Sequence, residues 1–250
     1  MTLGYLYTWL MIFLRATGVV VQLPQLVGRT APIMVRMGLA TCLATLLAGV
    51  VPEVPMPGDY AGLILACAGE IAMGLALGFV GQMTFAAVEL AGRIISSEIG
   101  LSVAPGMPGP ELGAEPLVNF ISAFAIVLFF LFSGHLMVLS AFVRSFSLAL
   151  PGAARFGPGA AELVIVSASR VIELGVRMAA PFIALNFLIT LAFSVLGRAV
   201  PRMSVFILSA SVRSIGGLAL CSGAGALIAR YLFVEFSDLP LKLLQLLPGR

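Results

Sequence analysis

The sequence predicts an all-α, polytopic membrane protein of about six helical units, and three observations support this class. Apolar residues make up 60% of the 250 residues and charged residues only 10%, whereas soluble domains average about 45–50% and about 25%. The apolar runs are continuous, without the period-two alternation of a membrane β-barrel. Several runs also reach the length of about 20 residues that a membrane-spanning helix needs.

The same totals exclude several classes of protein. A soluble enzyme, a disordered tail and a secreted disulfide scaffold would all need more polar residues or more cysteines. The net charge is +3, and the basic residues are spread along the chain, so nucleic-acid binding has no support. Cys42, Cys67 and Cys221 lie inside apolar runs. We interpret them as small buried hydrophobic residues, with no metal site and no cofactor.

The first half of the chain contains three apolar runs. No basic segment precedes the first run and Arg15 interrupts it, so we expect a retained span, not a cleaved signal peptide. Three prolines at alternating positions end the second run and forbid a helix there. The third run carries Glu70 and is followed by a mixed stretch. These segments are residues 3–21, a connector at 22–29, residues 33–51, the proline loop 52–59, residues 60–90 and the mixed stretch 91–103.

The second half begins with the longest non-helical stretch, residues 104–116, which is rich in proline and glycine. Residues 117–143 follow without any Asp, Glu, Lys or Arg and form the clearest predicted span. An amphipathic helix is predicted at 162–177, because Ser169, Arg170, Glu173 and Arg177 share one face. The remaining segments are a connector at 150–161, an uncharged span at 178–197, a basic turn at 198–202, an apolar stretch at 203–233 and a mixed tail at 235–250.

Domain organisation and orientation follow from the same survey. We find no fixed-period repeat and no boundary for a second domain, so residues 1–250 are predicted to form one membrane domain. Basic residues flank both ends of the last apolar stretch and cannot all be cytoplasmic if that stretch crosses once. Either the stretch is a hairpin, or some helices do not cross the bilayer in the ordinary way.

Glu70, Gly74 and Gly78 are the first candidate functional residues. An ionisable group within an apolar helix is costly and marks a functional place by default. The alternative that we favour is a contact that Glu70 makes with a neighbouring helix or subunit, although the sequence shows no partner. Gly74 and Gly78 form a G-x-x-x-G pattern, which lets helix backbones approach closely in a membrane.

A second candidate is a polar stripe on one helical face, formed by Glu89, Arg93, Ser96, Ser97 and Gly100. Its neighbours are apolar, so we favour a stripe that faces protein or a channel over a solvated surface. His135, alone in its apolar run, is more often a helix contact than a ligand or a base. No catalytic triad, phosphate loop or metal cluster is apparent in the sequence, so we predict that the protein is not an enzyme.

Five segments follow one another along the chain in a recognisable order. They are Glu70 with the glycines that follow it, Ala91-Gly92-Arg93-Ile94-Ile95 with Gly100-Leu101-Ser102, residues 129–135 ending in Gly134-His135, Ser145-Phe146 with Leu150-Pro151, and Ala180-Pro181 through residues 197–206, which include Pro201. In this order the segments resemble the FliR/SctT family of type III export proteins. Each segment is weak alone, but the ordered set covers most of the chain. The chain departs from the family in the loop after Ser102 and in the segment after Phe206.

The resemblance implies a subunit of a protein export gate in the bacterial inner membrane at the flagellar basal body. FliP-type and FliQ-type proteins would be its partners, with FlhB-type and FlhA-type proteins, unfolded exported substrates and membrane lipid as further contacts. Its helical hairpins would sit largely above the bilayer plane. Glu70, Gly74, Gly78, Gly92, Arg93, Gly134, His135, Pro181 and Pro201 would serve helix packing and assembly. The pore plug would consist of Ser102, Val103, Ala104, Pro105, Gly106, Met107, Pro108, Gly109, Pro110, Glu111, Leu112 and Gly113.

Three alternatives remain. The cargo would be virulence proteins if the chain serves an injectisome. A stand-alone secondary transporter would explain Glu70 and Arg93 in apolar surroundings, but we find no inverted-repeat symmetry between the halves. An integral-membrane enzyme would need clustered histidines or carboxylates, and is the weakest alternative.

Overall fold

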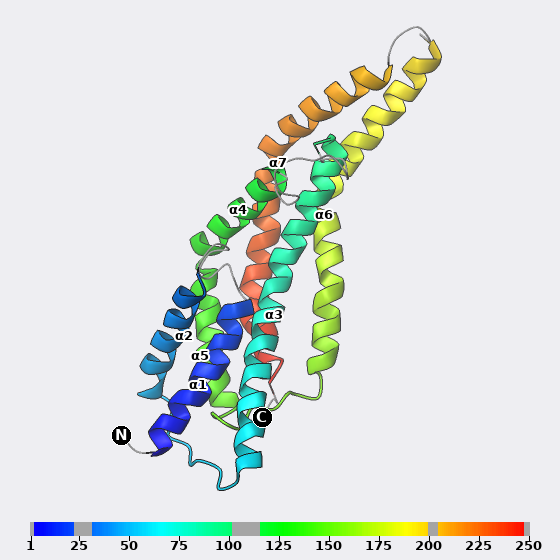
Figure 1. Ribbon diagram of the computed structural model, residues 1–250. Helices are drawn as coiled ribbons and strands as arrows, with labels where there is room; N and C mark the ends of the chain where they lie inside the picture. Colours follow the sequence, from blue (N-terminus) through cyan, green and yellow to red (C-terminus); the bar gives the residue numbers. More distant parts are fainter. Residues whose placement is uncertain (1–2, 23–31, 102–115, 200–204, 248–250) are drawn as a thin grey trace. The chain divides into compact units, whose positions relative to one another are not determined.

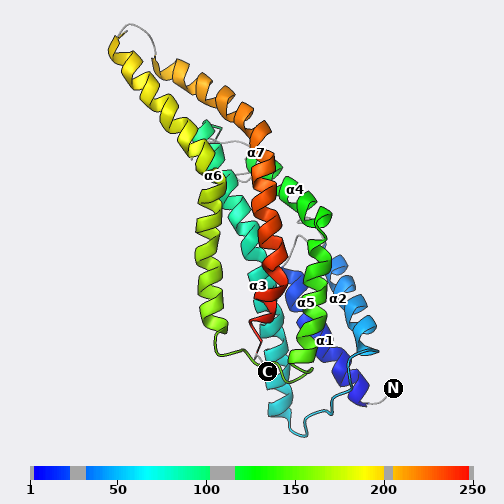
Figure 2. The ribbon, with the colours of Figure 1, turned by 180° about the vertical axis from the view of Figure 1, so that it is seen from behind.

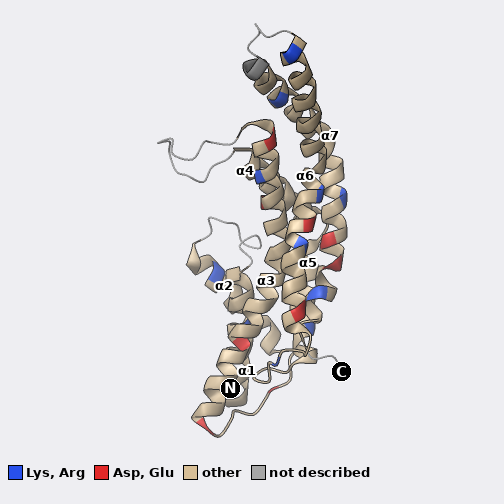
Figure 3. Ribbon diagram, turned by 90° about the vertical axis from the view of Figure 1, so that its right-hand side faces the viewer, with Lys and Arg blue, Asp and Glu red and all other residues tan. Residues whose placement is uncertain are grey.

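The computed structural model describes residues 3–22, 32–101, 116–199 and 205–247, which form seven α-helices and no strand (Figure 1). The helices are α1 (Leu3–Gln22), α2 (Ile33–Ala48), α3 (Tyr60–Ile99), α4 (Pro116–Leu131), α5 (Gly134–Leu148), α6 (Ala160–Ala199) and α7 (Val205–Leu244). The all-helical prediction is therefore confirmed. Most of the ribbon carries no charged residue (Figure 3), as expected of helices that lie in lipid or against other protein.

The chain divides into two compact units. The first unit comprises Met1–Met83, Ser133–Ala168 and Phe236–Arg250. In it, α1 packs against α2, and the indole N–H of Trp9 donates to Thr45 Oγ1 at 3.2 Å. Buried residues on α2 are small (Ala40, Ala44 and Ala48), and their i, i+4 spacing aligns them on one face of the helix.

The second unit comprises Thr84–Phe132 and Ser169–Glu235. Aromatic contacts join its helices: Phe85 of α3 meets Phe129 of α4 edge-to-face, with ring centroids 5.3 Å apart. Where α6 ends and α7 begins, the two helices lie side by side (Figure 2). A Cβ atom at Gly216 would lie 3.6 Å from Leu185 Cδ2, which places α7 in ordinary contact with α6.

Three helices are longer than the sequence suggested. α3, α6 and α7 each contain 40 residues, or about 60 Å, roughly twice the hydrocarbon thickness of a bilayer. The predicted boundaries near residues 90 and 177 and the predicted end near residue 233 are wrong. α3 continues through the mixed stretch to Ile99, α6 joins the predicted amphipathic helix to the uncharged span, and α7 continues into the tail to Leu244. Backbone hydrogen bonding tolerates isolated charges on a helix surface, so a charge alone does not end a helix.

The predicted span 117–143 is broken instead of continuous. Phe132 and Ser133 form a turn between α4 and α5, and Ser133 has φ of 57°. Such a left-handed conformation is uncommon for a residue with a Cβ atom. The uninterrupted apolar pattern contained no proline or paired glycine at this point, so the sequence held little sign of the break.

The first of the two alternatives for the last apolar stretch, a hairpin, is wrong for the residues that the structure describes, since α7 runs from Val205 to Leu244 without interruption. By length and composition, α1, α3, α6 and residues 208–244 of α7 are long and apolar enough to cross a membrane, and the α4–α5 pair is a fifth candidate. The protein is thus a multi-pass helical membrane protein. The expectation that the three cysteines are buried is wrong, since Cys42 is exposed and Cys67 and Cys221 are only partly buried within this chain.

Candidate functional site

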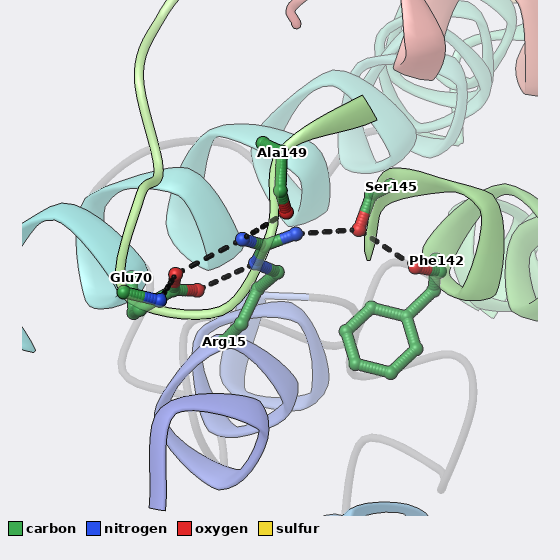
Figure 4. Close-up of polar contacts among 6 residues, drawn as sticks. Arg15, Glu70, Phe142, Ser145 and Ala149 are labelled. Carbon is green, nitrogen blue, oxygen red and sulfur yellow. Dashed lines mark hydrogen bonds and ion pairs between the residues drawn. The ribbon is translucent and has the colours of Figure 1, made fainter. Parts of the chain in front are cut away.

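A buried ion pair between Arg15 of α1 and Glu70 of α3 lies in the first unit (Figure 4). Arg15 Nε donates to Glu70 Oε2 at 2.6 Å, and Arg15 Nη2 donates to Oε1 at 3.0 Å. Both side chains are fully shielded from solvent. The pair has the two-pronged guanidinium–carboxylate geometry that gives the strongest charge-assisted hydrogen bonds.

The remaining donors of Arg15 bind the end of α5. Nη1 donates to Ser145 Oγ at 2.9 Å, and Nη2 also donates to the carbonyl oxygen of Ala149 at 3.1 Å. The guanidinium carbon lies 4.2 Å from the centroid of the Phe146 ring, within the range of a cation–π contact. Arg15 therefore ties α1 to α3 and to the C-terminal end of α5.

The connector after α5 completes the cluster. The backbone N–H of Gly152 donates to Glu70 Oε1 at 2.8 Å. Farther along the connector, the backbone N–H of Gly157 donates to the carbonyl oxygen of Leu246 at 2.9 Å. A buried charge is tolerated when it is paired and fully hydrogen-bonded. Glu70 thus has partners on α1 and on the connector, and the connector is bound both to α3 and to the C-terminal segment of the chain.

Close approach of α1 and α3 makes this pair possible. A Cβ atom at Gly74 would lie 3.0 Å from the carbonyl carbon of Arg15 and closer still to its oxygen. One at Gly18 would lie 2.8 Å from the carbonyl carbon of Gly74, and one at Gly78 would lie 3.1 Å from the carbonyl oxygen of Val19. The G-x-x-x-G pattern therefore has a packing role within the chain, and any role in assembly stays a prediction.

Arg15 is the functional residue that sequence reasoning missed. Its signal was present, because it interrupts the first apolar run just as Glu70 interrupts the third. Ionised residues at membrane depth usually pair with one another. This rule already predicts an ion pair between Arg15 and Glu70, which lie in separate apolar helices. Ser145 and Phe146, noted only for the family resemblance, also contact Arg15.

In the second unit, Gly92 and Arg93 have different surroundings. A Cβ atom at Gly92 would lie 3.3 Å from Val118 Cα, so this glycine brings α3 close to α4. Arg93 is 66% exposed and its Nη2 lies 2.8 Å from Glu89 Oε1. Ser96, one turn further on, is fully buried. The predicted polar stripe is therefore shielded within this chain at Ser96 and exposed at Arg93.

Other polar contacts join α3 to α6 and α7 in the same unit. The amide of Asn186 donates to Glu98 Oε2, and Ser214 Oγ donates to the carbonyl oxygen of Ile99 at 3.0 Å. On α6 and α7, Arg170 Nε lies 2.9 Å from Glu235 Oε1. Glu173 and Arg177 form an i, i+4 pair at 2.6 Å. The predicted amphipathic face is therefore a set of ion pairs.

The other predicted site residues are scattered. Gly134 is buried at the start of α5, and His135 beside it is half-buried. Pro181 lies inside α6, where it leaves the carbonyl of Arg177 without its usual helical donor. Ser102 to Gly113, the predicted plug, and Pro201 lie outside the described residues. Among the predicted site residues that the structure describes, Glu70, Gly74 and Gly78 lie together at the contact of α3 with α1.

The Arg15 cluster has a structural role, because its contacts join helices to one another. Its carboxylate accepts hydrogen bonds from Arg15 and Gly152, and it has no contact with solvent. Among the described residues, no group of three or more His, Cys, Asp or Glu side chains could hold a metal ion. The arrangement is suited to fixing three helices and a connector in one geometry.

Comparison with known proteins gives a consistent result. Residues 6–239 match the family described as bacterial export proteins, family 1. The flagellar biosynthetic protein FliR of Escherichia coli (strain K12) is 30% identical over 247 residues, covering 97% of this chain and 94% of the relative. FliR of Caulobacter vibrioides is 28% identical, covering 86% of each chain.

A relative from a different system is also similar. The Yop proteins translocation protein T of Yersinia pestis is 28% identical over 188 residues, covering 73% of this chain and 71% of the relative. The family match spans every described helix at least in part. The chain therefore belongs to family 1 of the bacterial export proteins, the family that its ordered motifs predicted.

Proposed function

We propose that the chain is a subunit of the flagellar type III protein export gate. With FliP-type and FliQ-type proteins it would form the closed pore through which unfolded flagellar proteins cross the bacterial inner membrane. The observation that carries this proposal is the family match over residues 6–239, with FliR relatives similar along nearly the whole chain. The role is that of a non-enzymatic structural component.

The exposed apolar surface of the long helices supports a multi-subunit assembly. α6 and α7 each contain an 18-residue window that is apolar enough to cross a membrane. Only 11% of that window in α6, and 22% of it in α7, is buried within this chain. Large side chains such as Phe187, Leu188 and Ile215 are more than 60% exposed. Because helices of about 60 Å exceed one perpendicular crossing, sister subunits are suited to cover what lipid does not.

The transporter alternative loses its main support. Glu70 motivated it, yet this carboxylate is fully shielded and bound by Arg15 and Gly152. A proton or ion pathway needs a carboxylate that reaches water or exchanges partners. Arg93, the other motivating residue, is paired with Glu89 on an exposed face.

Virulence cargo is the second candidate, because a Yersinia translocation protein is 28% identical over 73% of the chain. The flagellar relatives cover more of the chain, so we place flagellar cargo first. A genetic test separates the two. The chain should restore swimming to a host strain that lacks its own FliR, if the host's remaining subunits accept it, and should fail to restore effector secretion to an injectisome mutant.

Assembly is the direct test of the proposal. The full chain is co-expressed with the FliP-type and FliQ-type proteins of the same genome, with an affinity tag on the FliP-type protein. We expect all three to co-purify from inner-membrane fractions as one complex, with FlhB-type and FlhA-type proteins associating at the basal body. If the chain purified alone while the other two formed a complex, the proposal would be wrong.

The plug assignment rests on the sequence resemblance and covers residues 102–113. Deletion of residues 106–113 should leave the complex intact but let ions leak, because the deletion removes the segment that closes the pore. The measurement is ion flux in vesicles that contain the complex and hold a membrane potential. A complex that stayed ion-tight after the deletion would show that other residues close the pore.

A further inference from the structure

A cavity of about 440 Å³ lies between α6 and α7 in the second unit. Its volume falls in the range of about 300–1,000 Å³ that is typical of ligand sites. Three arginines line it: Arg170 and Arg177 from α6, and Arg230 from α7. Figure 3 shows basic and acidic segments near one another along these ribbons.

The charges around the cavity are unevenly matched. Arg170 is paired with Glu235, a cavity residue that is buried. Arg177 is paired with Glu173, and both of these side chains are at least half exposed. Arg230 has no hydrogen bond or ion pair with any residue that the structure describes. One positive charge at the cavity is therefore uncompensated, which favours an anionic ligand.

The other lining residues determine which kind of anion fits. Tyr231 adds a phenol to the polar side, whereas Leu174, Leu227 and Val234 form an apolar side. Val234 is 51% exposed, and the neighbouring Phe233 is 52% exposed. A basic cavity that continues into exposed apolar helix surface matches a ligand with an anionic head and a hydrocarbon tail.

We propose that this cavity binds the phosphate headgroup of an anionic phospholipid, with the acyl chains lying along the exposed apolar face of α7. The guanidinium of Arg230 would donate to the phosphate oxygens, and Arg177 would add a second positive charge. Arginine suits this role because its planar donors match two phosphate oxygens at once. The site is separate from the Arg15 cluster and does not depend on the proposed export function.

The test uses the full-length chain, purified in a neutral detergent and stripped of lipid. Dioleoyl phosphatidylglycerol is titrated in, and native mass spectrometry counts the bound lipids. Dioleoyl phosphatidylcholine and inorganic phosphate are titrated in parallel. We expect one phosphatidylglycerol site that is at least about fivefold tighter than phosphatidylcholine, with no displacement by inorganic phosphate at equal concentration.

Three variants examine the charge argument. Arg230→Gln should weaken phosphatidylglycerol binding about tenfold, because it removes the unpaired cation. Glu173→Gln should strengthen binding about twofold, since it releases Arg177 from its exposed partner. Arg198→Gln, an equal loss of charge in the last turn of α6, is the control and should leave binding unchanged. A purely structural role for Arg230 would not predict the opposite effect of Glu173→Gln.

Several results would overturn the proposal. Equal binding of both lipids, or an Arg230→Gln variant with unchanged affinity, would show that the cavity does not distinguish an anionic headgroup from a zwitterionic one. Displacement by inorganic phosphate would show that it takes a free anion instead of a lipid. If Arg230→Gln released a co-purifying protein and left lipid binding intact, the cavity would serve a protein contact.

Discussion

Gly74 of α3 lies against the backbone of Arg15 in α1. The side chain of Arg15 binds Glu70, which lies one turn before Gly74 on α3. A Cβ atom at Gly74 would lie 3.0 Å from the carbonyl carbon of Arg15. Because residues i and i+4 share a helix face, the glycine that permits the close approach and the carboxylate that binds the arginine lie together on α3. The Glu-then-glycine pattern is therefore one packing device: a small residue brings α1 close enough for its charge to be neutralised.

The first prediction concerns the ion pair. Arg15→Gln or Glu70→Gln should each lower the free energy of unfolding by about 3–5 kcal/mol, because each leaves an uncompensated buried charge. The double variant should recover part of that loss, with a coupling energy of at least about 1 kcal/mol. Equilibrium unfolding of the purified chain in mixed detergent micelles measures all three values.

Arg93→Gln is the control for the ion pair. Arg93 is 66% exposed and also paired with a glutamate, yet an exposed pair contributes only about 0–1 kcal/mol. We expect a change at the low end of that range. Strict additivity of Arg15→Gln and Glu70→Gln would contradict the pairing that the structure shows.

The second prediction separates two glycines on helices of the first unit. Gly74→Ala should destabilise the chain by about 1–3 kcal/mol, because the new methyl group forces α1 away from α3. Gly38→Ala, at a helical position with nothing within 4 Å, should stabilise by about 0.5–1 kcal/mol through helix propensity. Equal effects in the same unfolding assay would mean that α1 and α3 are not in close contact.

The same contact predicts an assembly defect. Gly74→Leu or Gly78→Leu should abolish co-purification with the FliP-type and FliQ-type proteins, because the larger side chain separates packed backbones. Gly38→Leu is the matched control and should assemble if α2 has no partner at that position. Normal co-purification of the Gly74 and Gly78 variants would show that assembly does not need the α1–α3 contact.

The third prediction compares two glycines with the same backbone conformation. Gly100 and Gly152 have φ of 77° and 79°, so alanine at either position costs about 1–2 kcal/mol of left-handed strain. A Cβ atom at Gly152 would also lie 3.1 Å from Tyr7 Cζ, whereas one at Gly100 would have no neighbour within 4 Å. Gly152→Ala should therefore be the more destabilising change.

Tyr7→Phe provides a check on that comparison. It removes the hydroxyl that lies nearest to the added methyl group at Gly152. In the Gly152→Ala background it should recover part of the lost stability, measured as the thermal midpoint of the detergent-solubilised chain. A larger loss for Gly100→Ala, or no recovery with Tyr7→Phe, would argue against the packing of α1 on the connector.

The fourth prediction concerns the break between α4 and α5. Ser133 has φ of 57°, which glycine adopts without steric cost. Ser133→Gly should be neutral or stabilise by up to about 1 kcal/mol, whereas Ser133→Val should destabilise by at least about 1 kcal/mol, because a β-branched side chain is strongly disfavoured in this conformation. If valine were tolerated as well as glycine, α4 and α5 would form one continuous helix instead.

Much of this protein could be predicted from its sequence. Composition and apolar run length predicted a multi-pass helical protein, and the helices that begin at Leu3, Ile33 and Tyr60 were located at their first residues. The ordered motifs indicated the export family. These features are local, because hydropathy and proline positions depend on neighbouring residues alone.

The partners of the buried charges were decided only by the tertiary structure. Arg15 and Glu70 are separated by 55 residues, and Arg15 and Ser145 by 130; nothing local in either segment indicates which helix face meets which. The continuity of α6 through Pro181 and the break at Ser133 also depend on packing, since propensity is weak compared with tertiary contacts. The sequence by itself determined that this chain has apolar helices carrying a few charges, whereas the packing of α1 on α3 decided how Arg15 and Glu70 neutralise each other.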